Sequence, residues 1–105
     1  MSAVSVIAVI TTNPGQRETI LEAFRANMPA VHAEDGCIEY FPTIDAEGMG
    51  SFQTPFGEDT FVVIEKWASK DHLMAHAVSP HMKEYASKTK DLIADRTIHV
   101  LSAAS

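Results

Sequence analysis

The chain has 105 residues, 46% of them hydrophobic, and its fourteen acidic and eight basic residues give a net charge of −6. This length is enough for one hydrophobic core, so we expect a single domain over residues 1–105. The acidic balance and the scattered lysines and arginines do not suit a phosphate-binding surface, which excludes nucleic acid as an expected partner.

The first apolar segment, residues 4–12, predicts a β-strand. Its β-branched and small residues occupy both parities, which is typical of a strand that is covered on both faces. It lacks the features of a secretory leader and is shorter than the ~20 apolar residues that cross a bilayer, so we expect a cytoplasmic protein without a membrane partner. The single cysteine, Cys37, allows no intrachain disulfide.

A helix is predicted next, with its start within residues 13–16. Asn13 is placed to cap the helix, Pro14 suits the first turn, and Gln16 stands where a capping-box partner would. Pro29 is expected to end or kink the helix, because proline lacks the N–H and clashes with the preceding turn. The apolar stripe of this helix consists of Ile20, Leu21, Phe24 and Met28.

Two more strands follow, with a long loop between them. Residues 37–44 predict a strand, and Pro42 inside it favours an edge position or a bulge. Residues 46–59 have no period and predict a loop, in which Phe52 and Phe56 either fold back onto the domain or form a lid or a subunit contact. From Thr60 the sequence is again apolar on both parities, which predicts the third strand.

A short helix capped by Ser69 is predicted after the third strand. Its apolar face would leave His72 in solvent and His76 on the flank. That face consists of Leu73, Met74, Ala77 and Val78.

The last two elements are a second helix and a fourth strand. Ser79 and Pro80 are expected to start the helix, which places His81 in its first turn. Apolar residues at helical spacing continue to Ile93, and residues 96–103 predict the strand.

The element order is therefore β-α-β-β-α-α-β, which predicts an α+β fold of the ferredoxin-like, split βαβ type. In this fold a four-stranded antiparallel sheet carries its helices on one face. The first and third strands are nevertheless apolar on both parities, so the second face needs a cover that the chain does not contain. We expect a homodimer in which two such open faces pack together.

Two segments, EDGCIEYF and FVVIEKWASKDHLMAHAVSPHMKEY, resemble the antibiotic biosynthesis monooxygenase family, in its quinol-monooxygenase-like branch. The resemblance implies a dimeric α+β barrel. It does not imply one reaction, because members include cofactor-free quinol and polyketide oxygenases, haem-degrading enzymes and isomerases of small phosphorylated signals. The matching positions are Gly36, Cys37, Ile38, Tyr40, Glu65, Trp67, Ser69, Leu73, His76, Pro80 and His81.

The chain departs from two branches of the family at informative positions. In the polyketide oxygenases an asparagine accompanies the tryptophan that lines the pocket, whereas here Val63 stands four residues before Trp67. The haem-degrading branch needs an asparagine, a tryptophan and a histidine ligand where this chain has Ala8, His76 and Ala86. The resemblance therefore implies no haem, and no other cofactor is expected.

The three histidines at 72, 76 and 81 raise the question of a metal site. Histidines at i and i+4 can chelate zinc, but the third ligand would have to come from beyond the break at residues 79–80, and no acidic residue stands at an obvious ligand spacing. We expect no metal. His76 and His81 are instead candidate catalytic bases that flank the helix junction, and the alternative is a structural hydrogen bond that fixes this junction.

Three further residues are candidates for substrate binding. Trp67 would line an aromatic pocket or belong to the core, and Tyr40 would donate a hydrogen bond to substrate or to an ordinary buried partner. Glu65 is a carboxylate in an apolar strand, so it must face water or be paired, with a histidine as one candidate partner.

The function expected from these residues is that of a cofactor-independent monooxygenase. His76 or His81 would deprotonate a quinol or dihydroxy-aromatic molecule, and the resulting anion would reduce O₂ without metal or flavin. The alternatives are an isomerase of a small carbonyl metabolite, with or without a phosphate group, and a ligand-binding dimer without catalytic activity. The absence of a glycine-rich phosphate loop argues against a bound nucleotide cofactor in each case.

Overall fold

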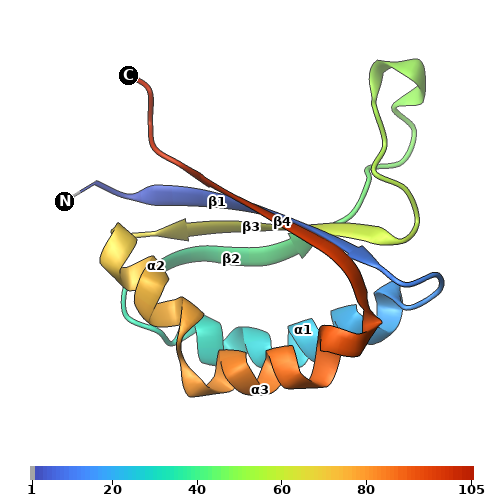
Figure 1. The fold of residues 1–105 in the computed structure, drawn as a ribbon. Coiled ribbons are helices and arrows are strands. Elements are labelled where there is room, and N and C mark those ends of the chain that lie inside the picture. The colour runs from blue at the N-terminus through green and yellow to red at the C-terminus, as the bar shows by residue number, and fades with distance from the viewer. Residues whose placement is uncertain (1) are drawn as a thin grey trace.

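Residues 2–105 are described by a computed structural model, in which helices cover one face of a four-stranded antiparallel sheet (Figure 1). The strands are β1 (Val4–Thr12), β2 (Cys37–Thr43), β3 (Thr60–Trp67) and β4 (Ile93–Leu101), in the order β2-β3-β1-β4. The helices are α1 (Arg17–His32), α2 (Lys70–Ala77) and α3 (Pro80–Thr89). The predicted α+β, ferredoxin-like arrangement is confirmed.

Strict alternation along β1 decides which side chains meet the helices. Val4, Val6, Ala8 and Ile10 are buried, whereas the residues between them are only partly covered. The β3 residues paired with these four, namely Trp67, Glu65, Val63 and Phe61, lie on the same face. The core forms between this face and α1, which contributes Ile20, Leu21, Phe24 and Val31.

The start of α1 differs from the prediction. The helix begins at Arg17 after Gln16, and no side chain caps it, so the expected cap by Asn13 was wrong. Gly15 has a φ of +78°, which interrupts the helical path between Asn13 and Arg17. The Asn13 amide instead donates to the carbonyl oxygen of Asp91 at 2.9 Å, which ties this turn to the segment before β4.

Pro29 was expected to end or kink α1, and it does not end it, because the helix continues to His32. Pro29 begins the last turn, where the cost of its missing N–H is limited to one hydrogen bond near the helix end. Its carbonyl oxygen accepts from the N–H of Ala33 at 3.1 Å, and the following Val31 is fully buried. Packing of Val31 therefore outweighs the local preference of proline.

The prediction for β2 is confirmed, since it is an edge strand with an irregular register between Cys37 and Glu39. Pro42 is tolerated there because an edge strand has one unpaired side. The last strand was predicted at residues 96–103, whereas β4 begins three residues earlier and ends two residues earlier, at Ile93–Leu101. The 3₁₀ turn Lys90–Leu92 follows α3 and β4 begins at Ile93, so Leu92 and Ile93 keep their apolar contacts outside the helix.

The buried face of α2 is not the one that the helical wheel predicts. Ser69 does cap the helix, by accepting from the N–H of His72 at 3.2 Å. However, Met74 and Val78 are 60% and 61% exposed, and His76 is the buried residue of α2. The helix has only two turns and lies at the end of the sheet, so the partners of its polar side chains set its rotation.

His72, expected in solvent, is half-buried. Its Nδ1 lies 2.7 Å from the hydroxyl of Ser69, and its ring packs directly over Gly36. A Cβ at Gly36 would collide with this ring, and Gly36 also has a φ of +82°. The turn before β2 therefore requires glycine for two separate reasons.

The second face of the sheet and one loop are left uncovered. On this second face, Phe41 pairs with Ile64 and Leu101 pairs with Ser5. Both are large apolar residues, and they are 40% and 49% exposed. The loop between β2 and β3 projects away from the helical layer (Figure 1). Its Phe52 is 88% exposed, so this ring does not fold back onto the domain. No helix within residues 2–105 is long and apolar enough to cross a membrane.

We expect Gly36→Ala to destabilise the fold more than Gly48→Ala, which is the matched control. Both glycines have positive φ, but a Cβ at Gly48 meets nothing within 4 Å. Gly48→Ala should cost about 1 kcal/mol from backbone strain, and Gly36→Ala a further ~1–3 kcal/mol from overpacking against His72. Urea unfolding measures both. Equal costs at the two positions would contradict the role assigned to the His72 contact.

Candidate functional site

The candidate site lies between the end of β3 and the junction of α2 and α3, on the covered face of the sheet. Trp67 is fully buried, and the ring of His76 lies against it with a centroid separation of 4.6 Å and a tilt of 32°. The ring of Tyr40 meets His76 edge-on at 5.3 Å and stacks on Phe24 at 5.0 Å. The structure thus brings together three residues that the sequence singled out, in a layer that is filled by their own side chains.

A carboxylate that the sequence analysis missed joins the two candidate bases. Oε2 of Glu34 lies 2.7 Å from Nδ1 of His76 and 3.1 Å from Nε2 of His81. Glu34 belongs to the turn between α1 and β2, 42 residues before His76. In the sequence, Glu34 stands just before Asp35 and Gly36, a pattern that predicts only a turn. No local pattern indicates that its partners are His76 and His81.

Ser79 completes this junction. Its hydroxyl donates to the carbonyl oxygen of His76 at 2.8 Å and lies 3.2 Å from Nε2 of His81. It does not cap α3 through a side-chain hydrogen bond, although Pro80 occupies the first turn as predicted. His81 is confirmed in that first turn, and its Nδ1 is buried without a hydrogen-bond partner among the described residues.

Glu65 is paired with a neighbour on its own strand. The indole N–H of Trp67 donates to its Oε1 at 2.9 Å, and none of the histidines hydrogen-bonds to it in residues 2–105. Burial raises the pKa of Glu65 above its ordinary value, while the Trp67 hydrogen bond and the charge of His76 lower it. Glu65 therefore fixes the indole ring that forms one wall of the site.

The other polar side chains near the cluster are poor bases or nucleophiles. Burial raises the pKa of Tyr40 and raises that of Tyr85 to about 12, so both phenols stay protonated at neutral pH. Burial, followed by the charges of Glu34 and Glu65, raises the pKa of the Cys37 thiol. A thiolate is the reactive form of cysteine, which leaves the histidines as the available bases.

The remaining histidines lie apart from the site. His72 contacts Ser69 and Asp35, and His32 hydrogen-bonds to the carbonyl oxygen of Tyr40 at 2.8 Å. His99 pairs with Ile7 across the two strands. Within the described part of the chain, no group of three metal-ligating side chains could hold a metal ion.

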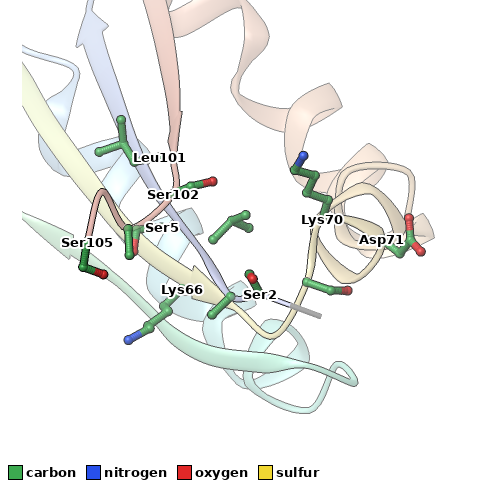
Figure 2. Close-up of a pocket in the computed structure, with 12 residues that line it drawn as sticks. Ser2, Ser5, Lys66, Lys70, Asp71, Leu101, Ser102 and Ser105 are labelled. Atoms are coloured by element: carbon green, nitrogen blue, oxygen red, sulfur yellow. The ribbon is translucent and has the colours of Figure 1, made fainter.

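Two cavities flank the region in different ways. A groove of about 240 Å³ between α1 and α3 includes His81 and Tyr85, together with Asn27 and Lys88. A larger cavity of about 1040 Å³ lies between the chain ends and the start of α2, where Figure 2 shows serine side chains and two lysines. None of the candidate bases or substrate-binding residues lines the larger cavity. The groove reaches the cluster at His81, and a third cavity of about 430 Å³ reaches it at Tyr40.

Known proteins resemble this chain over nearly all of its length. Residues 3–88 match the family model described as antibiotic biosynthesis monooxygenase. A relative from Escherichia coli named "Probable quinol monooxygenase YgiN" is 40% identical over 99 residues, which cover 92% of this chain and 94% of that protein.

Solved structures agree with the fold. The Mycobacterium tuberculosis protein Rv0793 superposes with a TM-score of 0.80 at 27% identity, covering 99% of this chain and 97% of the other. The Pseudomonas aeruginosa protein PA3566 has a TM-score of 0.81 at 24% identity, covering 100% of this chain and 97% of the other, and shows the fold alone.

Glu65→Gln is expected to stabilise the protein at neutral pH, because the amide oxygen can still accept from Trp67 without a charge being buried. The folded-state pKa of Glu65 is raised, so the stability that its protonated form contributes is present below the unfolded value of about 4.5. It is lost as pH rises through the folded value. The urea midpoint of the wild type should therefore fall more between pH 4 and pH 8 than that of Glu65→Gln. Glu22→Gln, at an exposed position of α1, is the control and should follow the wild type.

Proposed function

The chain belongs to the antibiotic biosynthesis monooxygenase family, and we propose that it oxygenates a quinol or another dihydroxy-aromatic small molecule without metal or flavin. The observation that carries this proposal is the position of His76, a buried base in contact with the rings of Trp67 and Tyr40. Aromatic side chains around an imidazole suit a planar phenolic ring, and in this proposal the filled layer opens to admit the substrate beside His76. The name of the Escherichia coli relative supports the same substrate class.

The proposed reaction balances without an external reductant. A quinol and O₂ contain the atoms of a hydroxyquinone and one water, so the substrate supplies all four electrons that reduce O₂. A base takes a phenolic proton and leaves an electron-rich anion that can react with O₂. One oxygen atom bonds to a ring carbon, the O–O bond breaks, and the other atom leaves as water with the proton returned by the base.

In this proposal the residues of the cluster have distinct roles. His76 is the base, and His81 is the second imidazole of the junction, beside the groove between α1 and α3. Trp67 and Tyr40 are the aromatic walls, and Glu65 holds the indole in place. The protein would act chiefly by orienting the substrate and excluding water from the anion.

We place the approach of the substrate at the α1–α3 groove. His81 is the more exposed histidine, with a side chain that is 26% exposed against 6% for His76. A ring that enters beside Tyr85 meets His81 first, and the aromatic layer around His76 lies behind it. Bulky substitutions in the groove would therefore block binding without touching the base.

The open face of the sheet supports a second proposal, that two copies of the chain pair through it. Ile7, Val9 and Ile64 lie on this face and are only half-buried, and Phe41 extends the apolar surface across β2. Covering these side chains with a second copy removes apolar area from water, which favours association. Light scattering at micromolar concentration should give a dimer, and a monomer would contradict this proposal.

Oxygen uptake with a panel of quinols and anthrone-like phenols tests the base directly. We expect His76→Gln to lower kcat by roughly 10²–10⁴-fold, the usual contribution of general base catalysis, and His81→Gln to lower the rate as well. His32→Gln is the matched control, because its amide can keep the hydrogen bond to the Tyr40 carbonyl oxygen. No uptake by the wild type, or full activity of both His76→Gln and His81→Gln, would overturn the proposed function.

A further inference from the structure

We propose that Glu34 is a positioning residue whose single carboxylate oxygen fixes the tautomers of both His76 and His81. The inference deepens the proposed function and rests on it for its catalytic meaning. Its geometric basis is independent of any reaction, since Oε2 of Glu34 lies within hydrogen-bond distance of both rings.

The backbone holds Glu34 in place from both sides. Its N–H donates to the carbonyl oxygen of Val31 at 3.0 Å, and its own carbonyl oxygen accepts from the N–H of Cys37 at 3.3 Å. Two residues further on, the carbonyl oxygen of Gly36 accepts from the N–H of Ala68 at 2.8 Å, which attaches the turn to the end of β3. The carboxylate therefore projects from a fixed turn, and its side chain is only 16% exposed.

The chemistry of a carboxylate then determines where the imidazole protons lie. An ionised carboxylate can only accept, so each ring nitrogen that faces it must carry a proton. Neutral His76 is thereby held with its proton on Nδ1, which leaves the lone pair on Nε2. Neutral His81 is held with its proton on Nε2, which leaves the lone pair on Nδ1.

The buried Nδ1 of His81 agrees with this assignment. It has no hydrogen-bond partner among the described residues, and such a buried group is costly to leave unpaired. Rotation of the ring or a change of tautomer would forfeit the contacts of Nε2 with Glu34 and Ser79. The contacts of Nε2 with Glu34 and Ser79 therefore stabilise this ring orientation by more than the unpaired Nδ1 costs.

The same carboxylate compensates the charge that proton abstraction creates. When Nε2 of His76 takes a proton, its Nδ1–H continues to face Glu34, and the net charge of these two groups changes from −1 to zero. The titratable groups packed around the cluster are Glu65 from β3, Cys37 and Tyr40 from β2, and Tyr85 from α3, and all four are acids. The groove beside His81 adds Lys88 and Glu84, which pair with each other at 3.3 Å. No lysine or arginine of the described chain forms an ion pair with Glu34. The site is therefore built to accept one positive charge.

The sharpest test is the tautomer of each ring, read from ¹⁵N chemical shifts of the full chain above the titration of the histidines. We expect His76 with a protonated Nδ1 and His81 with a protonated Nε2 in the wild type. In Glu34→Gln the amide can donate as well as accept, so at least one ring should shift toward the other tautomer or a mixture. Glu22→Gln, at an exposed position of α1, should leave both patterns unchanged.

The second measurement is the change in kcat relative to KM, which a purely structural role of Glu34 would leave unaltered. With an active quinol, Glu34→Gln should lower kcat by about 10²-fold or more while KM changes much less, because the base and not the binding surface is altered. Unchanged tautomers in Glu34→Gln, or His76 protonated on Nε2 in the wild type, would overturn the inference. Fixed tautomers in a wild type that consumes no oxygen would instead reject the proposed function and leave the positioning role intact.

Discussion

The contacts of one Glu34 oxygen with His76, a hydrogen bond of 2.7 Å, and with His81, at 3.1 Å, are the interaction on which the covered side of the fold depends. They join the turn after α1 to the junction of α2 and α3, which lies more than 40 residues further along the chain. They also explain the rotation of α2, because His76 can be buried only where a carboxylate meets its Nδ1. With His76 turned inward, Met74 and Val78 are left on the exposed side.

This junction serves stability and chemistry with the same contacts. The pairing of two imidazoles with a largely buried carboxylate satisfies polar groups that would otherwise be costly in the interior. The alternative considered for His76 and His81, a hydrogen bond that fixes the helix junction, is thus present in the structure. It does not compete with a role as base, since a base needs an oriented ring, and orientation is what the junction provides.

Local patterns predicted most of the backbone, and the exceptions share one physical cause. The bounds of β1, the edge position of β2 and the cap at Ser69 follow from alternation, proline and capping chemistry, which act over a few residues. The wrong cap at Asn13, the inward turn of His76 and the role of Glu34 depend on partners between 42 and 78 residues away. Trp67, Tyr40 and the two histidines were identified from family motifs, whereas Glu34, the first residue of the segment EDGCIEYF, is not among the matching positions. Its partner is visible only when the turn before β2 is placed beside α2.

In the proposed reaction the quinol supplies the electrons, and the protein supplies an oriented base beside aromatic side chains. Reaction of the purified chain with a quinol under ¹⁸O₂, without added flavin or metal, tests this claim most directly. The account predicts a hydroxyquinone that carries one ¹⁸O atom, with the second atom found in water. A product with no ¹⁸O, or oxygen incorporated from solvent water, would contradict it.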